Sequence, residues 1–336
     1  MKRIVVRSYG SPDQLTLEDS QPPSPGPGQV LVHLSAAGVN PVDTYRRAGT
    51  QGYTPDLPFT PGFEGAGVVA AVGADGQPVS AGQGTPAAKG NPAPALVVGQ
   101  RVYVGWSVSG TYGQWCIADR SQVFALPPSL SFFQGAGLFV PYFTAYRGMV
   151  FRGGVQKGAK VLIHGASGGV GSAALFWASY LGLLAWGTAG SSEGVQRVLN
   201  QGALGCWNHR YPGYWVIMAR EVGRFDLILE MNAHTNLQGD LGLLSPAGRV
   251  MVVGSRGDIA ITPRRLMGIE GDIRGVVLAK NTGEENHLTA VELERALEQG
   301  GHIPEPRVFP LSQASEVHRL VESGEASSGK MVLDCR

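Results

Sequence analysis

A run of eight residues with a glycine at every third position most constrains how this chain can fold. The run, His164 to Gly171, directly follows the short apolar segment 161–163. Continuous apolar residues of this length are typical of a buried parallel strand. The glycines let the backbone turn sharply and approach a ligand closely. Residues 172–180 predict a helix, whose unpaired first N–H groups and dipole favour an anion. Together these features predict a site for the pyrophosphate of a dinucleotide.

The residues after the second predicted strand indicate which dinucleotide is favoured. In NAD-binding proteins an acidic residue that binds the ribose is expected about 20 residues after the glycines. No acidic residue occurs from Lys160 to Ser192, and the predicted strand 183–188 ends in small neutral residues. These leave room for a 2′-phosphate and favour NADP over NAD. An offset strand would still let Glu193 reach the ribose, and His209 and Arg210 could approach the phosphate from the side.

Length, charge and cysteine usage limit the class of protein. At 336 residues the chain exceeds one typical core, which predicts two domains. The net charge is +1 and the basic residues are scattered, so the sequence predicts no basic surface for binding nucleic acid or an anionic membrane. The longest apolar stretch, 173–186, is too short and interrupted to span a bilayer. Three widely separated cysteines predict a reduced, cytoplasmic setting.

The pattern of elements divides the chain into three parts. Residues 1–130 are β-rich, with strands predicted at 4–6, 15–18, 29–36, 64–72 and 101–104. Residues 131–283 alternate strands and helices, which predicts parallel strands at 161–164, 183–188, 205–207, 225–231 and 249–254. Residues 284–336 predict helices near 289–299 and 312–322 and a closing strand, 331–333, that returns to the N-terminal β domain. The Gly/Ala/Pro-rich segment 73–98 predicts a mobile surface loop.

Several motifs carry a family resemblance. The segments AGVNPVDTY at 37–45 and PGFEGAG at 61–67 resemble the N-terminal signatures of medium-chain dehydrogenase/reductases. The glycine run is similar to that of zeta-crystallin-type NADPH-dependent quinone oxidoreductases, as are VPYFTAY (140–146), GTAG (187–190), NHR (208–210) and VVGSRG (252–257). The resemblance covers nearly the whole chain apart from 73–98. It implies an α/β protein with a Rossmann domain (131–283, a parallel sheet with helices on both faces), a GroES-like β domain (1–130 completed by 284–336), a cleft between them, and a homodimer or homotetramer.

The resemblance also implies NADPH as the cofactor and a set of residues around it. Ser167, Gly168, Gly169 and Val170 would hold the pyrophosphate, and Gly190 and His209 would border the adenosine phosphate. Asn236, Val253, Gly254, Ser255 and Arg256 would line the cofactor further along. Val276, Val277 and Leu278 would flank the nicotinamide, with Asn40, Tyr45 and Thr144 facing them and Lys330 near the cleft. One departure concerns the substrate wall: a family aromatic after Tyr45 is replaced here by Gln51, with Tyr53 two residues later.

The resemblance raises the question of a metal, and the ligand types argue against one. Zinc alcohol dehydrogenases of the superfamily have a cysteine at the position of Asn40 and a histidine at the position of Phe63. Zinc requires Cys, His or carboxylate ligands, which an amide and a phenyl ring cannot replace. Glu64 alone does not make a site, so we expect no metal.

Chemistry without a metal favours reduction of a conjugated acceptor. Hydride transfer to a quinone or enone forms a resonance-stabilised oxyanion, which a hydrogen bond and a nearby proton source can stabilise. Asn40 and Tyr45 are the predicted catalytic residues, because both are neutral donors. The leading hypothesis is a quinone reductase. The alternatives are an NADPH-dependent reductase of α,β-unsaturated aldehydes or ketones, and a non-catalytic NADPH-binding or RNA-binding protein.

Structural roles compete with functional ones for four of these side chains. Tyr45 could simply pack against Tyr146, and Asn40 could hold the turn before Pro41. His164 is interpreted as a buried structural histidine and Glu64 as an anchor of the fold.

Overall fold

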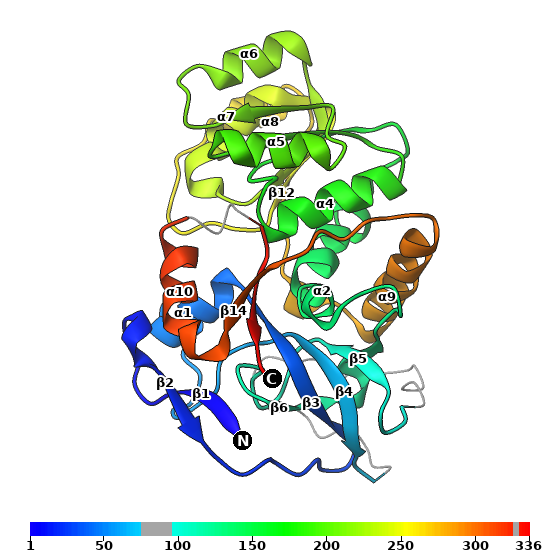
Figure 1. The fold of residues 1–336 in the computed structure, drawn as a ribbon. Helices are drawn as coiled ribbons and strands as arrows, with labels where there is room; N and C mark the ends of the chain where they lie inside the picture. The colour runs from blue at the N-terminus through cyan, green and yellow to red at the C-terminus, as the bar shows by residue number, and fades with distance from the viewer. Residues whose placement is uncertain (75–95, 325–328) are drawn as a thin grey trace.

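A computed structural model describes residues 1–74, 96–324 and 329–336 (Figure 1). The predicted loop 73–98 therefore lies almost entirely outside the described residues. Leu96, near the C-terminal end of this segment, is buried in the core of the β domain. No helix in the described part of the chain is long and apolar enough to cross a membrane.

The first unit is a mostly antiparallel seven-stranded sheet with the order β14-β15-β3-β4-β5-β7 and β6 paired to β3. All five strands predicted before residue 130 are present, although β3 continues to Val39 and β4 begins at Gly65. The smaller sheet pairs β1 (Lys2–Val6) with β2 (Leu15–Asp19). The large sheet consists of β3 (Gln29–Val39), β4 (Gly65–Val72), β5 (Arg101–Val104), β6 (Trp115–Asp119), β7 (Val123–Ala125), β14 (Arg307–Pro310) and β15 (Met331–Asp334).

The end of the chain completes this sheet. The predicted closing strand is confirmed: β15 pairs antiparallel with β3, Met331 opposite Val39. In Figure 1 the red C-terminal strand runs down beside the blue β3, although almost 300 residues separate them in the sequence. Strands β6, β7 and β14 were not predicted. Each is short, and β14 ends in a proline that weakens the strand signal.

The second unit is a parallel six-stranded sheet in the order β10-β9-β8-β11-β12-β13. Its predicted strands are confirmed, whereas β13 was missed and β12 begins five residues earlier than predicted, at Leu244. Alternate residues of β8 belong to two different core clusters: Val161 and Ile163 pack in one cluster, and Leu162 packs in the other. Both faces of the parallel sheet are therefore covered. The strands are β8 (Lys160–Ile163), β9 (Leu184–Ala189), β10 (Gly205–Asn208), β11 (Phe225–Glu230), β12 (Leu244–Val252) and β13 (Asp272–Gly275).

The helices of the parallel unit follow the strands in alternation, as predicted. The predicted helix 172–180 starts earlier, at Gly169, because Gly168 already has the extended backbone of an N-cap. The helices are α4 (Gly169–Tyr180), α5 (Ser192–Asn200), α6 (Tyr214–Glu221), α7 (Ala233–Leu243) and α8 (Pro263–Met267).

The remaining helices lie before and after the parallel unit. Helix α9 starts at Gly283, six residues before the predicted 289, because Thr282 and Glu285 form a capping box. Residues 139–151 form two π-helical turns around a short α-helix, a feature that the sequence did not predict. The α-helices are α1 (Pro41–Ala48), α2 (Phe132–Gly135), α3 (Thr144–Tyr146), α9 (Gly283–Glu298) and α10 (Ala314–Glu322). The π-helical turns are η3 (Phe139–Phe143) and η4 (Arg147–Phe151), and short 3₁₀ turns are η1 (Pro12–Gln14), η2 (Arg120–Gln122), η5 (Leu278–Lys280) and η6 (Leu311–Gln313).

One apolar core joins the two units. It contains Ala66 and Tyr103 from the β sheet, Phe139 and Phe143 from η3, and Ile163 from the parallel sheet. This shared core packs η3 between the two sheets. The glycine turn also lies close to the β domain, because a Cβ on Gly169 would lie 3.7 Å from Lys330 Cδ.

Candidate active site

The glycine turn has the geometry of an anion site. Gly165 has φ +59° and Gly168 N–H donates to its carbonyl at 3.0 Å, which closes the turn. A Cβ on Gly171 would lie 2.4 Å from Gly165 O, so only glycine lets α4 approach the turn this closely. The Oγ of Ser167 is buried and has no hydrogen-bond partner among the described residues. A free helix N-terminus and an unpaired hydroxyl together suit a phosphate.

Basic side chains from the segment after β10 lie beside the buried glycine that follows β9. A Cβ on Gly190 would lie 3.1 Å from His209 Nε2 and 3.5 Å from Arg210 Nε. The pKa of His209 is lowered by partial desolvation first, then by the charges of His164 and Arg210. Glu193, the candidate ribose ligand, interacts instead with its own backbone N–H and the Ser191 hydroxyl, which hold its pKa below the usual value. This arrangement favours the 2′-phosphate interpretation over ribose binding by Glu193.

The loops after β11 and β12 lie next to each other. Asn236 Nδ2 donates to Glu230 Oε1 at 3.3 Å, and Val253 N–H donates to the Glu230 carbonyl at 2.8 Å. A Cβ on Gly254 would lie 2.5 Å from Met231 O, which explains the glycine there. Ser255 Oγ donates to Gly257 O at 3.0 Å and braces the second loop.

The residues predicted to face the nicotinamide differ in exposure. Val276 and Leu278 are buried, at 5% and 7% exposed, whereas Val277 is 52% exposed. Thr144 is buried in α3, at 6% exposed. Of the three apolar residues, only Val277 is therefore exposed enough for its side chain to contact a ligand directly.

A hydrogen bond between the two units joins two predicted site residues. Arg256 Nε donates to Tyr45 Oη at 3.1 Å, and Arg256 N–H donates to His234 Nδ1 at 3.1 Å. Tyr53 lies beside Tyr45, with ring centroids 6.3 Å apart, so an aromatic side chain does reach this wall despite Gln51. The alternative that Tyr45 packs against Tyr146 is wrong, because Tyr146 contacts Trp177 and Phe151 in the core.

Asn40 lies in a buried network at the start of α1. Its Oδ1 accepts from Lys330 Nζ at 2.7 Å, and its Nδ2 donates to Glu64 Oε1 at 2.8 Å. Lys330 Nζ also donates to Glu64 Oε1 at 2.5 Å and to Val39 O at 3.0 Å. Val140 N–H donates to Glu64 Oε2 at 2.7 Å, which ties η3 to the β domain. Glu64 thus anchors the fold as interpreted, and the three donors of Lys330 are occupied within this network.

Asp43 and its buried partners were missed by the sequence analysis. Asp43 Oδ2 accepts from Asn40 N–H at 2.9 Å and from Tyr112 Oη at 3.3 Å, and Tyr112 Oη lies 3.0 Å from His318 Nε2. Burial raises the pKa of Asp43 to about 7 and lowers the pKa of His318 to about 3. The only signal in the sequence was Asp43 three residues after Asn40, the spacing of a helix cap.

At the position of the catalytic zinc in alcohol dehydrogenases, neither Asn40 nor Phe63 offers a zinc ligand. The amide of Asn40 is engaged by Lys330 and Glu64. The ring of Phe63 packs edge-on against Trp106 at 4.7 Å, with the Arg46 guanidinium 4.5 Å from its centroid. A phenyl ring has no lone pair to donate to zinc, and the nearby Arg46 cation would repel the metal, so the residues present do not fit zinc.

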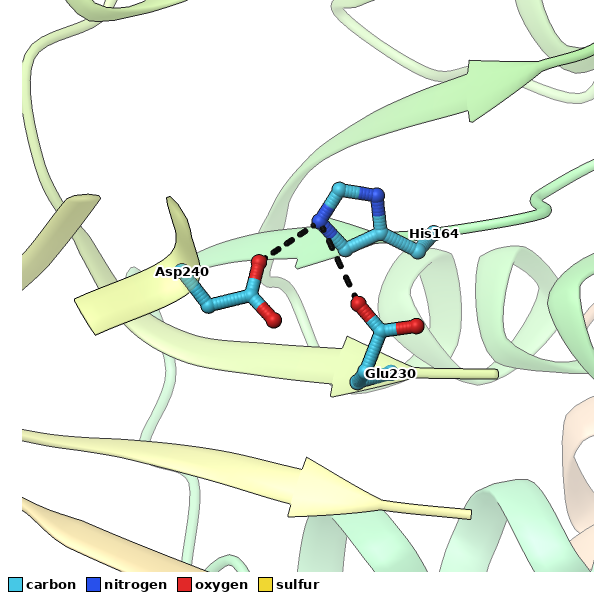
Figure 2. Close-up of side chains that lie close together, drawn as sticks. All are labelled: His164, Glu230 and Asp240. Carbon is cyan, nitrogen blue, oxygen red and sulfur yellow. Dashed lines mark hydrogen bonds and ion pairs between the residues drawn. The ribbon is translucent and has the colours of Figure 1, made fainter. Parts of the chain in front are cut away.

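A second buried polar cluster lies beneath the glycine turn (Figure 2). His164 Nε2 is 2.9 Å from Asp240 Oδ1 and 3.7 Å from Glu230 Oε2, and all three side chains are at most 2% exposed. His164 is thus buried and hydrogen-bonded, as interpreted. Glu230 and Asp240 were missed, although Glu230, a carboxylate among the apolar residues 227–231, was a visible signal. His164 and Asp240 are hydrogen-bonded to each other, and the Glu230 carboxyl lies next to this pair without a direct hydrogen bond to the ring.

Comparison with known proteins matches this architecture and identifies the family. Residues 26–157 match the model described as "Alcohol dehydrogenase GroES-like domain", and 202–333 match "Zinc-binding dehydrogenase". A GroES-like sheet joined to a parallel dinucleotide-binding sheet defines a medium-chain dehydrogenase/reductase. Human quinone oxidoreductase is 42% identical over 99% of this chain and 97% of its own length. The chain belongs to the zeta-crystallin-type quinone oxidoreductase family.

Solved structures give the same result. Escherichia coli quinone oxidoreductase complexed with NADPH has a TM-score of 0.86 at 25% identity, covering 99% of this chain and all (100%) of that one. A mycobacterial protein complexed with NADPH has a TM-score of 0.84 at 27% identity, covering 99% of both chains. The expected α/β fold, with Rossmann and GroES-like domains, is thereby confirmed.

Proposed function

We propose that this chain is an NADPH-dependent quinone reductase. The observation that carries the proposal is the glycine turn. There the buried Ser167 hydroxyl and the first N–H groups of α4 have no side-chain partner among the described residues, so they can donate hydrogen bonds to a phosphate. Full-length similarity to proteins named quinone oxidoreductase supports the substrate class. The NADPH complexes of similar structures support the cofactor.

The predicted cofactor residues come from several segments, most of which follow strands of the parallel sheet. Ser167, Gly168, Gly169 and Val170 would bind the pyrophosphate through backbone N–H groups and the serine hydroxyl. Gly190 provides space for the 2′-phosphate, with His209 and Arg210 beside it. Further along the site the residues would be Asn236, Val253, Gly254, Ser255, Arg256, Val276, Val277, Leu278, Thr144 and Tyr45.

Lys330 contributes to the site by a different route. Its ammonium is engaged by Asn40, Glu64 and Val39. Its aliphatic stem passes beside Gly169, where an added Cβ would lie 3.7 Å from Lys330 Cδ. We therefore assign Lys330 to packing against the cofactor turn and to orienting Asn40.

The acceptor side of the reaction depends on two neutral donors. When bound, NADPH supplies a hydride, and a proton from solvent completes reduction of a quinone to a hydroquinone. Tyr45 Oη already accepts a hydrogen bond from Arg256, so its own hydrogen is free to donate to a substrate oxygen. Asn40 uses one N–H for Glu64 and keeps the second for the substrate. Both donors act without a metal by stabilising negative charge on the acceptor oxygen.

Three further assignments accompany the activity. We propose that residues 1–130 with 284–336 form the β-rich domain and that 131–283 form the NADPH-binding domain. The three free cysteines, Cys116, Cys206 and Cys335, support a reducing, cytoplasmic location. We also propose a homodimer or homotetramer, which the family resemblance implies.

A steady-state assay tests the activity. We expect 1,2-naphthoquinone and benzoquinone to oxidise NADPH, and NADPH to bind more tightly than NADH in a fluorescence titration. Consumption of NADPH with a 2-alkenal alone would instead identify a reductase of unsaturated carbonyl compounds. Tight, salt-sensitive RNA binding without NADPH oxidation would indicate a non-catalytic protein.

A pair of arginine variants tests the acceptor side. Arg256→Gln should lower kcat/KM for the quinone about tenfold, because a charge-assisted hydrogen bond to Tyr45 contributes about 1.4 kcal/mol. Arg264→Gln, an exposed arginine on α8, is the matched control and should leave kcat/KM unchanged. Equal activity of the two variants would remove Arg256 and Tyr45 from the mechanism.

A further inference from the structure

We propose that His164, Glu230 and Asp240 form a buried proton-sharing cluster that positions the cofactor loops, and that binding of NADPH increases the number of protons held by this cluster. The proposal rests on the proposed function, because it concerns the same dinucleotide site. It assigns a role to three residues that the reaction itself does not use.

The cluster joins three separate elements of the parallel unit (Figure 2). His164 follows β8, Glu230 ends β11, and Asp240 lies on α7. One ring nitrogen of His164 and one carboxylate oxygen each of Glu230 and Asp240 lie within 4.8 Å of one another. The cluster therefore sits at the carboxyl ends of the central strands, where open α/β sheets bind their ligands.

The hydrogen bonds around His164 indicate its protonation state. Thr188 Oγ1 accepts from Gly165 N–H at 3.2 Å, so its own hydrogen is free to donate to His164 Nδ1, also 3.2 Å away. The other ring nitrogen, Nε2, then carries the hydrogen of a neutral imidazole and donates to Asp240 Oδ1. The same bonds connect the ring to the first turn of the glycine loop.

The two carboxyl groups require a further proton. Glu230 Oε2 and Asp240 Oδ2 are buried and have no hydrogen-bond donor among the described residues. Two neighbouring carboxylates without solvent do not both remain ionised, and a proton on either supplies the missing donor. In agreement, burial raises the pKa of each carboxyl to about 7 and lowers the pKa of His164.

Other titratable groups face the cluster from the neighbouring elements. His209, after β10, lies near enough to His164 for a proton on one ring to disfavour a proton on the other, and the charge of Arg210 acts on His209 in the same direction. Tyr214 of α6 has a raised pKa, chiefly from burial and then from the charges of Asp240 and Glu230. Of these groups, His209 is a second imidazole that can bind a proton, so the experiment must separate it from the carboxyls.

The cluster lies directly beneath the loops that we assign to the cofactor. Glu230 Oε1 accepts hydrogen bonds from Asn232 N–H and Asn236 Nδ2, and the Glu230 carbonyl accepts from Val253 N–H. Negative phosphates bound above these loops favour the protonated cluster. The apparent pKa of the cluster is therefore higher in the NADPH-bound protein than in the free protein. Affinity for NADPH is then highest below the pKa of the free cluster and falls as the pH rises above about 7.

Calorimetric titration of the whole chain with NADPH tests this coupling. Titrations at pH 7.5 in two buffers of different ionisation enthalpy measure the protons taken up. We expect an uptake of about half a proton, which corresponds to an approximately tenfold rise in Kd between pH 6.5 and 8.5. An absence of NADPH binding would overturn the proposed function and this inference together, whereas binding without proton uptake would overturn only the inference.

Isosteric variants locate the proton. Asp240→Asn and Glu230→Gln imitate the protonated carboxyls, so each should bind NADPH with less proton uptake and a flatter pH dependence. Asp226→Asn is the matched control, because Asp226 lies exposed on the same strand β11, and it should behave as the wild type. Uptake that persists in both cluster variants and disappears in His209→Gln overturns the proposal, as would a stoichiometric bound metal that Asp240→Asn removes.

Discussion

Replacing Lys330 with methionine tests the network around Asn40 most directly. The change keeps an unbranched apolar side chain as far as Cε and removes the ammonium, leaving the carboxylate of Glu64 without its cation. The Glu64 side chain is 1% exposed and that of Lys330 13%, so water cannot readily compensate. Two donors to Glu64 remain, from Asn40 and from Val140 N–H.

The magnitude follows from these contacts. Removing one partner of a buried ion pair costs about 3–5 kcal/mol, and the two remaining donors favour the lower end. A loss of about 3 kcal/mol in the free energy of unfolding corresponds to a Tm lower by roughly 6–12 °C for a domain of this size. Because Lys330 also orients the Asn40 amide, kcat/KM for the quinone should fall as well.

A double-mutant cycle provides the measurement. Thermal unfolding is compared for the wild type, Lys330→Met, Glu64→Gln and the double variant, with the exposed Lys157→Met as control. We expect the double variant to recover at least about 1 kcal/mol relative to the sum of the single changes, because the uncompensated charge is gone. A Tm for Lys330→Met within 2 °C of the control, or strictly additive changes, would refute the reasoning.

Three further changes probe the turn and the buried histidine. Ser167→Ala should raise the Kd for NADPH about tenfold in a fluorescence titration with little change in Tm, because the hydroxyl has no partner without the ligand. Gly171→Ala should abolish tight NADPH binding. Gly275→Ala is the control and should leave it intact, because a Cβ at that position would meet nothing within 4 Å. Equal affinities of the two variants for NADPH would contradict the close approach of α4 to the turn. The pKa of His318 is about 3 in the folded protein and near 6.5 in the unfolded chain, so its contribution to the free energy of unfolding is fully present above pH 6.5 and is lost as the pH falls. In urea unfolding, the free energy lost between pH 7 and pH 5 should be about 2 kcal/mol smaller for His318→Gln than for the wild type.

The predictable parts of the fold have strong local signals. Residues 161–163 and the glycines that follow specify a strand, a turn and a helix within 20 residues, and the structure has all three. Short strands such as β13, with the sequence DIRG, lack such a signal. They form because a neighbouring strand offers them hydrogen bonds, which local sequence does not reveal.

The candidate site divides in the same way. Ser167 and Gly190 could be identified because they lie within recognisable motifs. The partners of Asn40 could not, since Glu64 and Lys330 are 24 and 290 residues away in the chain. Likewise, Asp240 is 76 residues from His164, and no spacing rule connects them.

The sequence by itself determined the phosphate-binding turn, the alternation of strands and helices, and the lack of zinc ligands at positions 40 and 63. Those properties depend on residue type and on contacts within a few residues. Only the tertiary structure decided that Lys330 orients Asn40, that Arg256 reaches Tyr45, and that two carboxyls are buried beside His164. The physical reason is that hydrogen-bond geometry and loss of solvent arise when distant segments pack together, and packing is a property of the whole chain.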